Sequence, residues 1–314
     1  MTLTTKPQGG LRISHTERVI DLESGVTKGE LVAYYASVAG LMLAHLKDRP
    51  VALLRAPAGV AGPQFFQKHA DSTELPELQL LARDLDPGHG PLLAIGSAAG
   101  LLAAAQMNVI EFHSWNMTTR TIQKPDRMVF DLDPGKGVTW AAVCEAAQLL
   151  HAFLTELGLK SFLKTSGGKG LHVVVPLPPR RDWPVVKQFA HAIVLHMAGV
   201  LPQRLVAKSG PKNRVGRIFV DYLCNGWGAT TAVAWSARAR PGMGVSVPVA
   251  WEELETLSGA AHWTVRNVAQ RLETGNHPWD GYTTSRQSLV RAMKVLGFTP
   301  PTPSTVSAQS EAAQ

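Results

Sequence analysis

Between residues 128 and 223 the sequence predicts strand, helix, strand, strand, helix and strand, in that order. Short runs rich in Val, Ile, Leu and Phe indicate the strands, and apolar residues every three or four positions indicate the helices. In the split βαβ arrangement that this order describes, the third strand fills the slot skipped by the first crossover, and the fourth flanks the first. The first strand is therefore expected between the third and the fourth. The predicted ranges are 128–133, 139–157, 159–164, 171–176, 184–200 and 217–223.

The first of these strands reads RMVFDLDP, from Arg127 to Pro134. Successive side chains of a strand alternate between its faces, so Asp131 and Asp133 share one face and the apolar residues share the other. Two neighbouring carboxylates repel each other unless a cation lies between them, and such hard oxygen ligands suit Mg²⁺ or Mn²⁺. A solvated pair of acids at a strand end is the alternative. A calcium loop of the EF-hand type is excluded, because Ala142 stands where a bidentate Glu is required.

The last predicted strand carries Asp221 among apolar neighbours. A carboxylate in such surroundings is costly unless it is paired or bound to a metal. A salt bridge to Arg217 or Lys208 would satisfy it. The predicted strand order instead places Asp221 beside Asp131 and Asp133, which favours one shared metal site.

A glycine-rich turn, SGGKG at 166–170, joins the second and third strands. It is not a Walker motif, because Lys169 precedes a glycine and a strand instead of a Ser or Thr and a helix. Consecutive backbone N–H groups beside a lysine and a hydroxyl nonetheless suit a polyphosphate, with an ordinary hairpin turn as the alternative. His172 follows on the next strand, either at this site or as a hydrogen-bonded core histidine.

Taken together, the carboxylates, the glycine turn and the histidine predict phosphoryl transfer assisted by two metal ions about 3.5 to 4 Å apart. Two alternatives from other classes remain open. One is a metal-dependent nuclease, and the other is a module that binds DNA ends without catalysis.

The N-terminal part, residues 11–125, is predicted to be a mixed α/β module. Thr27 and Glu30 form a capping-box pattern that predicts a helix start, and VALLR at 51–55 predicts a strand. The stretch 92–113 predicts strand, helix and strand. Further helical patterns occur at 251–257, 265–272 and 285–296.

Composition sets outer limits on the function. The formal net charge of +7 favours a polyanionic partner. The two cysteines match no metal-ligand spacing, which fits a reducing cytosol. The best apolar run, 91–109, contains Ser, Gln and Asn and predicts no membrane span. The polar ends 1–10 and 301–314 are predicted to be flexible, linker-like tails.

At PDRMVFDLDPG (125–135) and KTSGGKGLHVVVPL (164–177) the chain resembles the polymerase domain of bacterial ATP-dependent DNA ligase D, in the archaeo-eukaryotic primase superfamily. The likeness continues through TKGELVAYY at 27–35, FFQKH at 65–69 and IEFHSWN at 110–116, then through 219–242 and 263–272. It implies an α+β, primase-like fold, in which a βαββαβ (RRM- or ferredoxin-like) catalytic module at 126–300 packs on the N-terminal α/β module at 11–125.

The resemblance also implies an activity. The family extends primer 3′ ends with ribo- or deoxynucleotides at DNA gaps and double-strand breaks during bacterial non-homologous end joining. It takes nucleoside triphosphates with two Mn²⁺ or Mg²⁺ ions, and it binds DNA ends that carry a 5′-phosphate. Its partners are Ku and the ligase and phosphoesterase modules of the same polypeptide, which implies a cytoplasmic, nucleoid-associated protein without membrane contact.

The resemblance assigns roles to individual residues. The implied metal ligands and catalytic residues are Asp131, Asp133 and Asp221. The implied nucleotide-binding residues are Ser166, Gly167, Gly168, Lys169, His172, His113, Arg238 and Arg240. The implied DNA-binding residues are Arg18 and Lys28 at the 5′-phosphate, Phe65 and Phe66 as stacking rings on a helix, and Arg55 and Arg214. The chain departs from the family pattern at RAPAG (55–59), which lacks an acid, at Cys224 in place of an arginine, and at Trp227 in a loop that is often basic.

Overall fold

The computed structural model describes residues 11–70 and 77–301, which form two compact units built from separate stretches of chain. The first unit comprises the described residues up to Arg120 together with 164–169 and 230–280, and the second comprises 121–163, 170–229 and the stretch from Gly281 onward. The chain first passes to the second unit after Arg120, and segments 164–169 and 230–280 return to the first unit. The predicted modules, 11–125 and 126–300, stay a prediction. Apart from Pro301, the predicted tails lie outside the described residues.

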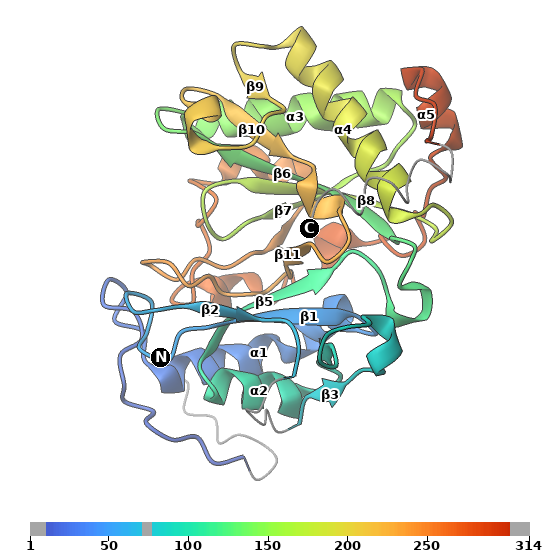
Figure 1. Ribbon diagram of the computed structural model, residues 1–314. Coiled ribbons are helices and arrows are strands. Elements are labelled where there is room, and N and C mark those ends of the chain that lie inside the picture. The colour runs from blue at the N-terminus through green and yellow to red at the C-terminus, as the bar shows by residue number, and fades with distance from the viewer. Residues whose placement is uncertain (1–10, 71–76, 302–314) are drawn as a thin grey trace. The chain divides into compact units, whose positions relative to one another are not determined.

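The first unit contains a six-stranded sheet in the order β11-β5-β1-β4-β3, with β2 pairing with β1. Helices α1 (Lys28–Leu46) and α2 (Ala98–Gln106) cover one face of it (Figure 1). The predicted helix start is confirmed, because the Thr27 side chain accepts from the Glu30 backbone and Glu30 accepts in return. The strands are β1 (Pro50–Arg55), β2 (Phe65–Gln67), β3 (Gln79–Leu80), β4 (Leu93–Ala94), β5 (Val109–Trp115) and β11 (Thr230–Ala232).

Helix α1 is the one helix of the described residues that is long and apolar enough to cross a membrane by length and composition. It buries Leu31, Tyr35 and Met42 in the core of the first unit. The Tyr35 hydroxyl also donates to the Ile110 carbonyl of β5, at 2.5 Å. These contacts are those of a core helix.

The expectation of a helix at Phe65 and Phe66 is wrong. Both residues lie on strand β2, whose backbone pairs with the end of β1, with Phe66 opposite Leu54. The three residues of β2 are too few to show strand alternation in the sequence. Both rings remain exposed, by 44% for Phe65 and 54% for Phe66.

The second unit contains the predicted βαββαβ order. It contributes β7-β8-β6-β10-β9 to a six-stranded sheet that also includes β12, so β6 lies between β8 and β10 as predicted. Figure 1 shows α3 and α4 packed over this sheet. Strand β9 was not predicted; it pairs in parallel with the outer side of β10. The elements are β6 (Arg127–Pro134), α3 (Trp140–Glu156), β7 (Phe162–Thr165), β8 (Leu171–Pro176), α4 (Trp183–Val200), β9 (Leu205–Val206), β10 (Ile218–Asp221) and α5 (Val290–Leu296).

Two predicted boundaries in the second unit are wrong by several residues. Strand β7 begins at Phe162 instead of 159, because Gly158 takes a φ of +76° and the Leu159 N–H bonds back to the Leu154 carbonyl at 2.8 Å. Leu159 thus closes helix α3. Helix α5 begins at Val290, because Ser285 bonds back to the Gly281 carbonyl at 2.9 Å and ends a separate turn.

The short helical patterns of the first unit form 3₁₀ helices instead of α-helices. They are η5 (Trp251–Thr256) and η6 (Val268–Arg271), near strand β12 (Pro248–Val249) in the chain. The remaining 3₁₀ turns are η1 (Arg83–Leu85), η2 (Thr119–Thr121), η3 (Pro211–Arg214), η4 (Leu223–Asn225) and η7 (His277–Trp279).

Candidate functional site

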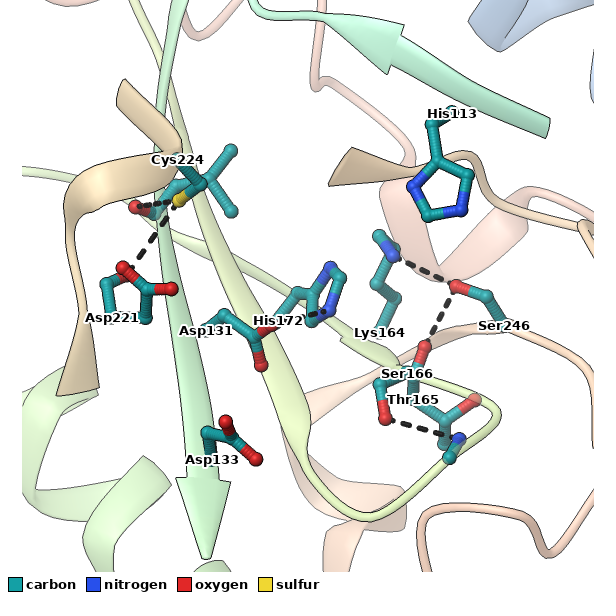
Figure 2. A network of polar contacts seen from close by, with 12 residues as sticks. His113, Asp131, Asp133, Lys164, Thr165, Ser166, His172, Asp221, Cys224 and Ser246 are labelled. Carbon is teal, nitrogen blue, oxygen red and sulfur yellow. Dashed lines mark hydrogen bonds and ion pairs between the residues drawn. The ribbon is translucent and has the colours of Figure 1, made fainter. Parts of the chain in front are cut away.

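A row of ionisable side chains crosses three neighbouring strands of the second unit. In the antiparallel pairing of β6 with β10, Asp131 lies directly opposite Asp221. On the other side, in the pairing of β6 with β8, Asp131 lies opposite His172. Directly opposite residues have Cβ atoms about 4.5 to 5.5 Å apart. The predicted strand order therefore brings these side chains together, as Figure 2 shows for His172, Asp131 and Asp221.

The apolar half of the same strand explains why the row is fixed. Phe130 and Leu132 are fully buried on the opposite face of β6. A slip of one residue in register would bury the two aspartates and expose these apolar side chains. The burial of Phe130 and Leu132 thus holds Asp131 and Asp133 at the accessible face, where their side chains are 35% and 38% exposed.

The electrostatics of the row are unfavourable for acids alone. Burial raises the pKa of Asp221, and the negative charge of Asp131 raises it further. The Leu223 backbone N–H, which donates to Asp221 at 2.6 Å, lowers this pKa but does not cancel the rise. The salt bridge considered from the sequence is absent among the described residues, since Asp221 pairs with neither Arg217 nor Lys208.

The neighbours of the other two carboxylates are cationic or protonatable. His172 Nε2 lies 3.4 Å from Asp131 Oδ2, and Arg214 forms an ion pair with Asp133. Clustered carboxylate oxygens that repel each other fit a divalent cation of the Mg²⁺ or Mn²⁺ type. The residue types of this row are those that such an ion prefers, and its binding by Asp131, Asp133 and Asp221 stays a prediction.

Two glycines allow the backbone to close around this face. A Cβ atom at Gly170 would lie 1.7 Å from the Leu132 carbonyl oxygen of β6. A Cβ atom at Gly135 would lie 1.6 Å from the Arg214 carbonyl oxygen. Both contacts are with backbone atoms, so no rotamer change can relieve them. Glycine is required where β8 and the Arg214 loop approach β6.

The glycine turn of residues 166–169 belongs to the first unit and runs directly into β8. The Ser166 hydroxyl accepts from the Gly168 N–H at 3.1 Å, and Gly167 adopts a φ of +68° that favours glycine. Arg238 donates from Nη1 to the Ser166 carbonyl at 2.8 Å. An added Cβ at Gly168 would lie 3.7 Å from the Arg240 guanidinium. The turn thus gathers two of the arginines that the resemblance assigns to nucleotide binding.

A buried carboxylate that the sequence analysis missed, Glu111 of β5, holds this arrangement. Its Oε2 accepts from Arg238 Nε at 2.9 Å and lies 2.7 Å from His113 Nε2, and its Oε1 accepts from the Ala239 N–H at 2.8 Å. Burial raises the pKa of Glu111, but these partners outweigh it and lower the pKa to about 2. Burial lowers the pKa of His113 in turn. Its position within IEFHSWN was the available signal, because an acid on a fully buried strand needs partners.

Lys164, at the start of the same segment, is buried as well. Its ammonium donates to the Ser246 hydroxyl at 2.8 Å, and that hydroxyl donates to the Thr165 carbonyl at 2.8 Å. Figure 2 shows this chain of contacts leading to the turn at Ser166. The turn is therefore anchored by side chains, unlike a plain hairpin.

Arg18 and Lys28, assigned to a 5′-phosphate, lie next to each other in the first unit. The Lys28 backbone N–H donates to the Arg18 carbonyl at 2.8 Å. Lys28 is only 4% exposed, and both burial and the charge of Arg18 lower the pKa of its ammonium. Within residues 11–70 and 77–301 this ammonium has no ion pair. Two cations held together in this way favour an anionic ligand.

The aromatic pair on β2 is also close to predicted residues. The Arg55 guanidinium lies over the Phe65 ring, 5.4 Å from its centre, and the Phe66 ring meets the His113 ring at 5.1 Å. Arg55 itself is only 7% exposed and donates to Gln67 Oε1 at 3.1 Å and to the Met107 carbonyl at 3.2 Å. The accessible groups here are the two phenylalanine rings.

The two departures near Asp221 occupy different surroundings. The Cys224 thiol is near the Val129 carbonyl at 3.3 Å, and burial raises its pKa well above the ordinary value. Trp227 is 42% exposed, packs edge-on against Trp183, and helps to line an open pocket of ≈ 720 Å³. The sequence did not predict this pocket, because its walls come from both α4 and the η4 loop.

This α+β chain has two sheets, acids and a histidine on adjacent strands, and a glycine turn that leads into one of these strands. These are the features of a primase-like fold. The chain belongs to the LigD primase-polymerase domain family, whose model matches residues 27–279.

Individual relatives agree with this assignment. The chain is 50% identical over 287 residues to the multifunctional non-homologous end joining protein LigD of Pseudomonas aeruginosa, covering 91% of this chain and 34% of that protein. The corresponding protein of Mycolicibacterium smegmatis is 32% identical over 246 residues, with 78% and 32% covered. This chain thus spans about a third of these relatives' length. A solved structure, the polymerase domain from Mycobacterium tuberculosis ligase D in complex with DNA, matches with a TM-score of 0.79 at 28% identity, covering 88% of this chain and 99% of that one.

Proposed function

We propose that this chain is a DNA-end-directed nucleotidyltransferase of bacterial non-homologous end joining. It adds ribo- or deoxynucleotides to primer 3′ ends at gaps and double-strand breaks. The observation that carries the proposal is the rung of His172, Asp131 and Asp221 across β8, β6 and β10. The parts of the proposal that concern end joining and DNA are supported by relatives named for end joining and by a matching structure that was solved with DNA.

In this proposal Asp131, Asp133 and Asp221 hold two divalent ions, Mg²⁺ or Mn²⁺. When bound, these ions supply Lewis-acid activation of the primer 3′-hydroxyl and neutralise charge on the leaving pyrophosphate. His172, assigned to the triphosphate by the resemblance, also orients the Asp131 carboxylate, whose Oδ2 lies 3.4 Å from its Nε2. The close approach of Gly170 to β6 keeps β8 against the strand that carries the ligands.

The nucleoside triphosphate is assigned to the residues around the turn. The exposed Lys169 and Arg240 side chains bind phosphate oxygens by charge-assisted hydrogen bonds. Gly167 and Gly168 form the turn that presents them, and their own N–H groups donate to the Ala260 carbonyl and the Ser166 hydroxyl, each at 3.1 Å. Ser166 shapes the turn through its bond to Gly168. Arg238 is fixed between Glu111 and Ser166, and His113 lies at the same carboxylate, where it serves the sugar of the nucleotide.

The DNA is assigned to three further groups. Arg18 and Lys28 bind the 5′-phosphate of the downstream strand, which supplies the anion that these paired cations favour. Phe65 and Phe66 stack on unpaired bases, with Arg55 holding Phe65 by a cation–π contact. Arg214 contacts the metal-bound nucleotide or DNA beside Asp133.

The proposed partners are Ku and the ligase and phosphoesterase modules of the same polypeptide. The relatives support this proposal in that they are named multifunctional and this chain spans about a third of their length. The proposed location is the bacterial cytoplasm, at the nucleoid.

Primer extension tests the proposal. The substrate is a gapped duplex with a 5′-phosphate, Mn²⁺ and ribo- or deoxynucleotides. Wild type is expected to extend the primer, and Asp131→Asn is expected to lose this activity by at least about a thousandfold, as for groups that act in the transition state. Asp182→Asn is the matched control, because Asp182 is an exposed acid of the same unit whose side chain makes no capping bond.

Three results would contradict the proposal. Extension by Asp131→Asn at the wild-type rate would remove the catalytic role of the rung. Binding of the gapped duplex without extension would indicate a recruitment module. Shortening of the primer that depends on Asp131 would indicate a nuclease.

A further inference from the structure

A second group of potential metal ligands lies in the first unit, and none of its members is on a strand that carries the aspartates. It consists of His69, Asp86 and His89, whose ligand atoms all lie within 4.8 Å of one another. His69 Nε2 is 2.7 Å and His89 Nδ1 is 3.5 Å from the same oxygen, Asp86 Oδ2. The two imidazole rings are stacked, with centres 4.9 Å apart and planes inclined by 13°.

Local structure brings these residues together. Asp86 and His89 are the first and last residues of the turn Asp-Pro-Gly-His, in which Gly88 has a φ of +89° and the His89 N–H bonds to the Asp86 carbonyl at 3.4 Å. Proline followed by a glycine with positive φ is the pattern of a type II turn. His69 follows β2 and is held opposite Leu92 by a β-bridge, while the Ala70 N–H donates to the Pro91 carbonyl at 2.8 Å.

The distances suit a bound cation. Metal–ligand distances of about 2.0 to 2.2 Å in a tetrahedral site place neighbouring ligand atoms about 3.3 Å apart. The separation of His89 Nδ1 from Asp86 Oδ2, 3.5 Å, is close to that value already. The His69 contact at 2.7 Å has to open by only about 0.6 Å, within the reach of a carboxylate rotation.

The exposure of the three side chains determines what can fill the remaining coordination position of the ion. The Asp86 and His69 side chains are 13% and 26% exposed, whereas His89 is 61% exposed. The site is therefore walled on one side and open to water on the other, so that water fills the remaining position. Two imidazoles and one carboxylate prefer Zn²⁺ and similar transition-metal ions over Mg²⁺.

We propose that His69, Asp86 and His89 bind one transition-metal dication of the Zn²⁺ class, which fastens the Asp86–His89 turn to the segment after β2. The ion links His69 to the Asp86–His89 turn, which restrains the end of the segment that carries Phe65 and Phe66. This inference does not rest on the proposed polymerase activity, since none of its ligands belongs to the aspartate row.

Calorimetric titration with Zn²⁺ tests it. The whole chain is first stripped with a chelator and transferred to metal-free buffer. Wild type is expected to bind one Zn²⁺ per chain at this site. His89→Ala and His69→Gln are each expected to weaken that binding at least about tenfold, because each removes one ligand.

Two controls separate this site from others. His277→Ala removes an exposed histidine that lies 3.3 Å from Asp280, and it is expected to bind Zn²⁺ like wild type. The double variant Asp131→Asn and Asp133→Asn removes the other acidic site, and it is expected to retain the one-to-one event.

The outcomes divide as follows. Weakening by both histidine variants, with both controls unchanged, supports the site. Absence of a one-to-one event in wild type would overturn it, and so would undiminished binding by both His89→Ala and His69→Gln. Loss of the event in the aspartate double variant would assign it to the other site and would also overturn the proposal. His89 is mostly exposed, so its variant is expected to fold, which far-UV circular dichroism checks.

Discussion

Replacing Glu111 by glutamine tests whether one buried carboxylate organises the cations of the first unit. In the native protein both of its oxygens accept, from Arg238, from the Ala239 backbone and at His113. Glutamine keeps the shape but has no charge, and its amide group presents N–H donors to other donors. The Arg238 side chain, 14% exposed, would then lose the carboxylate that balances it.

The expected magnitude follows from the pKa of the Glu111 carboxyl. Burial raises that pKa, but the His113 and Arg238 partners lower it from 4.5 to about 2. At about 1.4 kcal/mol per pKa unit, this change corresponds to roughly 3 kcal/mol of folding free energy. Because the pKa is lower in the folded state, the stabilisation is present above the unfolded value near 4.5 and is lost as the pH falls toward about 2.

Urea unfolding at several pH values measures this effect. Near neutral pH, Glu111→Gln is expected to be less stable than wild type by roughly 3 kcal/mol, and the difference is expected to shrink below about pH 4.5. Glu255→Gln, an exposed acid of the same unit, is the matched control and is expected to match wild type. Equal stability of Glu111→Gln and wild type at neutral pH would refute the reasoning, as would a difference that stays constant on acidification.

Two further predictions concern backbone and charge. Lys28→Met is expected to weaken binding to 5′-phosphorylated DNA ends selectively, which fluorescence anisotropy with phosphorylated and unphosphorylated ends measures. The unliganded variant is expected to be at least as stable as wild type, because it lacks a buried ammonium whose pKa is lowered by burial and by the charge of Arg18. Equal weakening for both kinds of end would contradict this prediction. Gly170→Ala is expected to destabilise by several kcal/mol, of the order of about 3, because its Cβ would meet the Leu132 carbonyl at 1.7 Å. The control is Gly199→Ala in helix α4, where an added Cβ meets nothing within 4 Å; it is expected to stabilise the folded protein by about 0.5 to 1 kcal/mol. Thermal unfolding compares the two variants. A Gly170→Ala variant as stable as wild type would show that β8 does not need this close approach.

The centre of the second unit could be predicted because local patterns determine it. The apolar residues that alternate with Asp131 determine which face of β6 is buried. The order of helices and strands determines which strands pair with β6. The first unit could not be predicted in the same way. Glu111 finds Arg238 and Ala239 across 127 and 128 residues of sequence, and no local pattern encodes that contact. His69 and Asp86 are 17 positions apart in the sequence, so no local pattern predicted the second ligand group either.

The balance of charges distinguishes clusters that are expected to bind a ligand from clusters that stabilise the fold. The Glu111 cluster combines one acid with a cation, and its lowered pKa means that it stabilises the fold. Asp221 with Asp131 is a cluster of like charges, and so is Lys28 with Arg18; in each, burial and the neighbour shift a pKa against the charged form, which costs stability. A fold that retains such repulsion is expected to recover the cost from a ligand of opposite charge. By this argument the acids call for cations and the bases for a phosphate, so neutralising either cluster should stabilise the unliganded protein, whereas neutralising Glu111 should not.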